Sequence, residues 1–210
     1  MSREAWLKER LNGIGASEAA AVIGVSPYIS NEELWEIKTG RKIPDDIGDK
    51  PYVKFGTEAE KHIRALFALE NPQYQVGYEE FKIIRNPDYP FIFATLDGWL
   101  TDEHSRNGVW ECKTTEILRP NQWAEWTDGV PNHYYVQILH QLLATGFDFA
   151  VLTARIRYTD RAGAKKSVTQ DYHIERQSVT DDLDYLLKEE VKFWELVKAD
   201  TRPPLMLPQI

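Results

Sequence analysis

Leu96-Asp97-Gly98-Trp99 is followed a short way along the chain by Trp110-Glu111-Cys112-Lys113, and these two stretches decide the fold. Each belongs to an apolar segment rich in aromatic and β-branched residues, which is typical of a strand. The polar residues 102–108 between them indicate a turn, and therefore an antiparallel pair of strands. Alternate side chains of a strand share a face, so Glu111 and Lys113 are expected to point the same way, with Asp97 beside them.

The rest of the chain changes from helical to strand patterns. Apolar residues at helical spacing, with capping and breaking residues at the ends, predict helices over residues 6–11, 17–25, 30–39, 56–70, 134–144 and 180–198. Segments of β-type composition predict strands over residues 80–84, 91–95, 109–113, 149–158 and 167–174. This order indicates a mixed α/β fold with one central mixed sheet flanked by helices, in a single domain spanning residues 1–210.

Composition limits the class of protein. The chain has 210 residues, of which 42% are hydrophobic and 28% charged, and neither a membrane helix nor a signal peptide is apparent, which predicts a cytoplasmic protein. The single cysteine, Cys112, excludes an internal disulfide and a cysteine-based zinc cluster, and the five histidines lack ligand spacing. The net charge of −8 argues against DNA binding by bulk positive charge, so any case for DNA rests on a local site.

The acidic and basic residues of the two strands suit phosphodiester hydrolysis. Magnesium prefers oxygen ligands and takes one or two carboxylates with waters and substrate oxygens, so Asp97 and Glu111 are predicted ligands together with the backbone carbonyl of Cys112. Manganese would be accepted by the same ligands. Lys113 would orient or deprotonate the attacking water, or stabilise the transition state, and the sequence leaves these roles open. The pattern is short enough to arise by chance, but a carboxylate inside an apolar strand needs a partner.

The order of several further motifs resembles the viral recombinase exonucleases of the lambda exonuclease and YqaJ type, within the restriction-endonuclease-like superfamily. The matching segments are Trp6 to Arg10, Ile14 to Glu18, Gly56 to Glu60, Leu96 to Gly98, Glu111 to Lys113, and Tyr135 to Gln137 with Gln141. Together they extend from Trp6 to about Tyr158. The resemblance implies a restriction-endonuclease-like core and a PD-(D/E)XK metal site.

The resemblance also implies roles for individual residues and for the protein. Glu60 would assist the metal site, Gln137 would lie near it, and Arg10 with Ser17 would hold the 5′ phosphate of a DNA end. The implied reaction digests the 5′ strand of linear duplex DNA and leaves a 3′ single strand for an annealing protein. Some members form homotrimer rings, and the implied source is a phage or prophage in a bacterial host cell.

Each of these residues also has a plainer interpretation. Ser17 at a helix start would cap that helix, and on the sequence alone this interpretation is favoured. Arg10 would be a solvated surface charge, and Glu60 would belong to a charged helix face. Gln137 and Gln141 share a helix face, which fits a polar cleft or an exposed surface almost equally.

Aromatic and basic residues in the second half of the chain are weaker signals. Trp123 and Trp126 are three residues apart, and packing under a loop is favoured over stacking on a base. The basic residues of the predicted hairpin turn would follow a DNA backbone or form a solvated surface; they are Arg155, Arg157, Arg161, Lys165 and Lys166.

Three functions remain in competition. The first is the exonuclease, the second an endonuclease or repair nuclease of the same fold, and the third a catalytically inactive protein that binds DNA ends. The complete set of Asp97, Glu111 and Lys113 argues against the third. A covalently closed circle separates the first two, because only an endonuclease cuts it.

Overall fold

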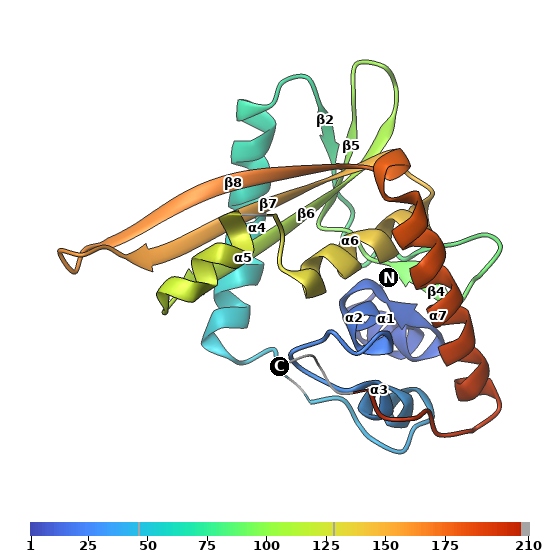
Figure 1. Ribbon diagram of the computed structural model, residues 1–210. Coiled ribbons are helices and arrows are strands. Elements are labelled where there is room, and N and C mark those ends of the chain that lie inside the picture. The colour runs from blue at the N-terminus through green and yellow to red at the C-terminus, as the bar shows by residue number, and fades with distance from the viewer. Residues whose placement is uncertain (46, 128, 207–210) are drawn as a thin grey trace.

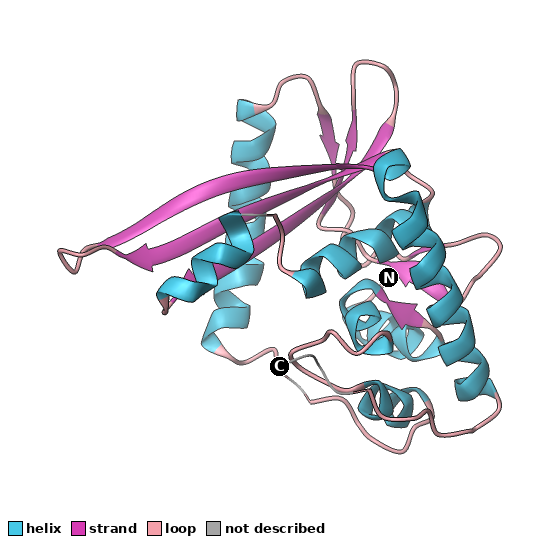
Figure 2. Ribbon diagram, viewed as in Figure 1, coloured by secondary structure: helices cyan, strands magenta, loops and turns pink. Residues whose placement is uncertain are grey.

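The strands form two sheets (Figures 1 and 2). The computed structural model describes residues 1–45, 47–127 and 129–206. Within these ranges a five-stranded sheet has the order β2-β5-β6-β7-β8 and a three-stranded sheet the order β1-β4-β3. The strands are β1 (Ile14–Gly15), β2 (Gln75–Gly77), β3 (Ile84–Arg85), β4 (Ile92–Ala94), β5 (Gly98–Thr101), β6 (Asn107–Ile117), β7 (Phe149–Thr159) and β8 (Lys165–Glu175).

The larger sheet is mixed because a helix separates two of its neighbouring strands. β6 pairs parallel with β7 after the chain crosses over through a helix, whereas the other neighbouring strands of this sheet are antiparallel. The turn between β7 and β8 is held by Asp160, whose carboxylate accepts hydrogen bonds from the backbone of Ala162 and Ala164. The resulting hairpin extends well past the helices (Figure 1).

Helices cover both faces of the larger sheet (Figure 2). The α-helices are α1 (Arg3–Glu9), α2 (Ala19–Val22), α3 (Asn31–Lys38), α4 (Pro51–Glu70), α5 (Ala124–Thr127), α6 (Asn132–Thr145) and α7 (Thr180–Lys198). On one face, Ile63 and Phe67 of α4 pack with Trp110 in one core cluster. On the other face, α6 and α7 pack against alternate residues of β7 in a second cluster. None of the described helices has the length and apolar character needed to cross a bilayer.

The mixed α/β architecture and several predicted elements are confirmed. α7 spans Thr180–Lys198 as predicted, and Ser30 caps α3 by accepting a hydrogen bond from the backbone of Glu33. β5 and β6 are the expected antiparallel pair. Trp126 is 4% exposed and Trp123 contacts the ring of Tyr158, so both tryptophans pack internally as favoured.

Several boundaries were predicted wrongly. The second sheet was not expected, and the strand predicted over residues 80–84 is reduced to Ile84–Arg85. The helix predicted to start at Gly56 begins at Pro51, whose fixed φ suits a first helical position. Ser17 lies within a 3₁₀ turn, Ala16–Glu18, and does not cap α2, which ends at Val22 and not Val25.

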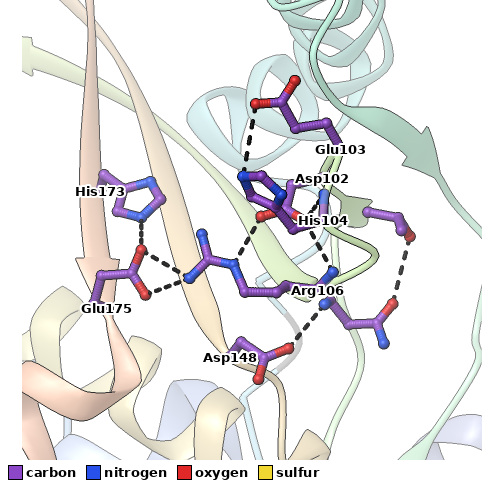
Figure 3. A network of polar contacts seen from close by, with 9 residues as sticks. Asp102, Glu103, His104, Arg106, Asp148, His173 and Glu175 are labelled. Carbon is purple, nitrogen blue, oxygen red and sulfur yellow. Dashed lines mark hydrogen bonds and ion pairs between the residues drawn. The ribbon is translucent and has the colours of Figure 1, made fainter.

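A polar network connects the strands at the end of the larger sheet opposite the β7–β8 turn (Figure 3). Arg106 donates to Asp102 in the β5–β6 turn and to Glu175 at the end of β8. The backbone N–H of Asn107 donates to Asp148, just before β7. These contacts join the ends of β6, β7 and β8 and so hold the register in which β6 presents its side chains.

A buried ion pair connects α6 to α7. The side chains of His140 and Glu190 are 0% exposed, and His140 Nδ1 lies 2.6 Å from Glu190 Oε1. His140 Nε2 donates to the carbonyl of Phe93 at 2.9 Å, which ties both helices to β4. Burial alone would lower the pKa of His140, but the Glu190 carboxylate and these hydrogen bonds outweigh it and raise the pKa.

The pair generates a stability prediction. Glu190→Gln removes the carboxylate that compensates the buried imidazolium, and removal of one partner from a buried pair is strongly destabilising. We expect the free energy of unfolding to fall by about 3 kcal/mol. Denaturant titration followed by circular dichroism would measure the change.

The neighbouring residue provides the control. Glu189 pairs with the exposed Lys192 on the same helix, and a surface pair of this kind contributes at most about 1 kcal/mol. Glu189→Gln should therefore leave the unfolding midpoint nearly unchanged. Equal midpoints for the two variants would contradict the stabilising role of the His140–Glu190 pair.

Candidate active site

The carboxylate of Glu111 is the centre of the site. Glu111 lies in the middle of β6 with only 2% of its surface exposed, and strand alternation turns it away from Trp110 and toward α6. Its Oε1 accepts from Lys113 Nζ and from Gln137 Nε2, each at 2.6 Å. Its Oε2 accepts from Gln141 Nε2 at 2.5 Å. Three side-chain donors therefore compensate one buried carboxylate, as a buried charge requires.

Asp97 occupies the bend between the two sheets, directly after Leu96 and before β5. Its Oδ2 accepts from the backbone N–H of Cys112 at 3.0 Å, and its carbonyl accepts from Arg64 at 2.5 Å. At the next residue, Gly98, a Cβ would lie 3.2 Å from both the Gly77 carbonyl oxygen and Trp110 Cε3, so glycine allows the close packing beside this bend. Burial raises the pKa of Asp97 well above its usual value, and repulsion by Glu111 and Glu60 adds to the rise.

Lys113 is the cation of the site and is nearly enclosed. Burial would lower its pKa, but the charges of Glu111 and Asp97 outweigh this effect and raise the pKa above its ordinary value. The ammonium group also lies 5.0 Å from the ring centroid of Tyr134 on α6, a cation–π contact.

Glu60 faces the same group of charges from α4. It accepts a hydrogen bond from Arg64 at 2.9 Å, one turn along the helix. Burial raises the pKa of Glu60, Arg64 opposes the rise, and the nearby Glu111 adds to it. Glu60 therefore belongs both to the charged face of α4 and to the candidate site. Arg64 connects the two, because it also binds the Asp97 carbonyl.

The predicted phosphate-binding pair also comes together. Arg10 Nη2 donates to Ser17 Oγ at 3.3 Å, and the guanidinium lies 4.8 Å from the Trp6 ring centroid. Trp6 in turn donates to Thr95, two residues before Asp97. The backbone N–H of Gly15, just before the 3₁₀ turn that contains Ser17, donates to Glu18 at 2.8 Å and so is not free for a phosphate.

The carboxylate of Glu18, which lies beside Arg10, is compensated by two nearby cations. Glu18 forms an ion pair of 2.7 Å with Lys38, whose side chain is 0% exposed, and a longer one of 3.7 Å with Arg10. Lys38 also donates to the carbonyl of Arg10 at 2.8 Å. Two cations therefore face one carboxylate, which leaves this cluster with a net positive charge.

The side chains suit a hard divalent cation that is completed by other ligands. Over residues 1–45, 47–127 and 129–206, no three His, Cys, Asp or Glu side chains converge as a metal-binding group. The predicted set of Asp97, Glu111 and the Cys112 carbonyl contains only two carboxylates, and magnesium commonly takes so few from the protein. Burial, with the repulsion of Glu111 and Glu60, raises the pKa of Asp97, and a bound cation would stabilise its ionised form.

Three contributors to the site were not among the predicted site residues. Gln141 binds Glu111 as closely as Gln137 does, and its spacing of four residues from Gln137 was the available signal. Arg64 and Tyr134 had no distinguishing pattern, because their contacts with Asp97 and Lys113 depend on how α4 and α6 pack on the sheet.

The fold is shared with known exonucleases. An alkaline exonuclease (LHK-Exo) from Laribacter hongkongensis superposes with a TM-score of 0.64 at 20% identity, over 94% of this chain and 93% of that chain. A phage-related exonuclease from Haemophilus somnus 129PT superposes with a TM-score of 0.53 at 11% identity, over 90% of this chain and 96% of that chain. At these identities the likeness establishes the fold: that of the alkaline exonuclease class of nucleases.

Sequence similarity then identifies the family. Residues 5–148 match the YqaJ-like viral recombinase domain, and the chain belongs to this family. The uncharacterized protein YqaJ of Bacillus subtilis (strain 168) is 30% identical over 194 residues, which cover 92% of this chain and 56% of that protein. The chain therefore spans a little more than half the length of this relative.

The raised pKa of Asp97 predicts a pH-dependent stability effect. Because Asp97 holds its proton to a higher pH when folded than when unfolded, the metal-free protein loses stability as pH rises from the unfolded pKa through the folded one. Asp97→Asn keeps the hydrogen bond from Cys112 and removes this loss. We expect the melting temperature in EDTA to rise by about 2–4 °C at pH 8, and by less at pH 5.

Asp102 provides a control of opposite sign. Hydrogen bonds from Arg106 and His104 outweigh partial desolvation and lower the pKa of Asp102, so Asp102→Asn should lower the melting temperature at pH 8. A melting temperature that also falls for Asp97→Asn would show that burial and repulsion do not raise the pKa of Asp97.

Proposed function

We propose that this chain is a metal-dependent exonuclease that hydrolyses linear double-stranded DNA from the 5′ end and leaves 3′ single strands for an annealing protein. The proposal rests above all on one observation: the carboxylates of Glu111 and Asp97 lie together with the cation of Lys113 in a nearly closed site. Membership of the YqaJ-like viral recombinase family supports the same activity and the role in recombination.

The metal ligands in this proposal are Asp97, Glu111 and the backbone carbonyl of Cys112. Magnesium, or manganese in its place, would neutralise charge that develops on the phosphate during hydrolysis. Gln137 and Gln141 fix the rotamer of Glu111 by binding both of its oxygens. Glu60 adds negative charge on the α4 side, and Arg64 holds it in place.

Lys113 has three alternative roles in this proposal. The charges of Glu111 and Asp97 outweigh burial and raise the pKa of Lys113, and these are the carboxylates proposed to bind the metal. Lys113 would orient the attacking water, deprotonate it, or stabilise the charge that develops in the transition state.

The polarity of digestion depends on how the DNA end is held. Arg10 and Ser17 are proposed to bind the 5′ phosphate. The two cations Arg10 and Lys38, which together face Glu18, supply the net positive charge for it. Trp6, which the Arg10 guanidinium contacts, donates to Thr95, two residues before Asp97, and this connection supports a phosphate site close to the metal ligands. A terminal phosphate held there would present the next phosphodiester to the metal site.

Digestion of end-labelled DNA tests the activity. Linear duplex DNA labelled at the 5′ or the 3′ end is incubated with magnesium, with manganese, or with EDTA. We expect early release of the 5′ label, no release in EDTA, and no cutting of a covalently closed circle. Asp97→Ala should reduce the rate by about 10³-fold or more, because a charge-stabilising group is lost.

The lysine variants separate chemistry from folding. Lys113→Ala is expected to lower the rate by about 10²–10³-fold while metal affinity is retained. Lys61→Ala, which removes an exposed lysine paired with Glu58, should cut at the parental rate. Cutting of the circle would assign an endonuclease, and an inactive folded parent would leave a protein that only binds DNA ends.

The phosphate site generates a separate prediction. Arg10→Ala should reduce the preference for a 5′-phosphorylated over a 5′-hydroxyl end, because the charge-assisted contact with the phosphate is lost. The ratio of kcat/KM on the two ends is expected to fall by about tenfold or more. Arg3→Ala, which removes an exposed arginine at the start of α1, should keep the parental ratio.

A further inference from the structure

Three aromatic rings lie one after another in space, starting beside Lys113, the cation of the site. Lys113 Nζ lies 5.0 Å from the centroid of Tyr134, at the start of α6. The ring of His133 lies 4.0 Å from that of Tyr134, and the ring of Tyr28 lies 5.8 Å from His133 in an edge-on arrangement. The rings therefore extend from the candidate catalytic lysine to the protein surface.

Tyr28 is the outer ring, and most of it is open to solvent. It is 73% exposed, although it belongs to a chain segment that is otherwise well fixed. The side chain of Ser26 is buried and accepts hydrogen bonds from the backbone of Tyr28 at 3.2 Å and of Ile29 at 3.4 Å. The backbone that carries the Tyr28 ring is thus fixed, while most of the ring itself is exposed to solvent.

The chemistry of these rings suits a flat, uncharged ligand. Burial and the neighbouring Tyr28 hydroxyl raise the pKa of Tyr134 to about 12, so its phenol stays neutral. Burial and the charge of Lys113 lower the pKa of His133, which favours the neutral imidazole. A phosphate gains little from contact with neutral rings, whereas any of the nucleobases can stack on them.

We propose that Tyr28, supported by His133 and Tyr134, forms a stacking subsite for the nucleobase of the 5′-terminal nucleotide, whose 3′-side phosphodiester is attacked beside Lys113. In a nucleotide one sugar separates the base from the phosphate, and this separation matches the placement of exposed Tyr28 next to, but outside, the charged site. The subsite rests on the proposed nuclease function and accounts for how a terminal nucleotide would be held without sequence preference.

Binding of DNA ends in EDTA tests the subsite without any cleavage. Fluorescence anisotropy compares a duplex with a normal 5′-terminal nucleotide and one whose terminal nucleotide lacks its base. The parent protein should bind the normal end about tenfold more tightly. Tyr28→Ala should reduce this ratio to near one, and Tyr28→Phe should keep it because the ring is retained.

An exposed tyrosine elsewhere provides the matched control. Tyr185 on α7 is 55% exposed and lies outside the three-ring cluster, so Tyr185→Ala should keep the parental ratio. Thermal unfolding would verify that each variant folds. Equal affinity of the parent for the two ends, a ratio unchanged in Tyr28→Ala, or failure to bind either end would overturn the subsite.

The same experiment distinguishes the subsite from the nuclease activity. If the parent fails to cut DNA with magnesium but discriminates between the two ends in EDTA, the proposed function fails and the subsite stands. If it cuts DNA without discriminating, the subsite fails and the proposed function stands. With magnesium, loss of the terminal base should lower kcat/KM of the parent but not that of Tyr28→Ala.

Discussion

The burial of the Glu111 carboxylate is the constraint on which the rest of the site depends. A carboxylate with 2% exposure is tolerated only when donors reach both of its oxygens, and these come from β6 itself and from α6. The position of α6 is therefore tied to the charge state of the site. The His140–Glu190 pair reinforces this position, because it anchors α6 to α7 and to β4.

The sequence predicts the face of β6 well because strand alternation is a local rule. Glu111 and Lys113 share a face and Trp110 lies in the opposite core, as their spacing requires. The β5–β6 pairing follows from the polar turn between two apolar segments. These features involve residues close together in the chain, so their outcome depends little on the rest of the molecule.

Other features depend on contacts between distant segments and have no local signal. β4 lies within a predicted strand, but its partners β1 and β3 have two residues each, too few to establish a period, and so the second sheet was missed. The bend at Asp97 arises because β4 and β5 belong to different sheets. For the same reason the pairing of Arg64 with both Glu60 and the Asp97 carbonyl could not be read from a charged helix face.

β6 contributes to two different environments through one strand. Trp110 fills the apolar core under α4, and the next residue, Glu111, lies in the charged site under α6. A slip of one residue in the pairing of β6 with β7 would exchange these faces, placing the carboxylate in the apolar core and the indole in the site. A misaligned chain would thus lose its core and its chemistry in the same error, so molecules that reach a stable fold also carry a correctly assembled site.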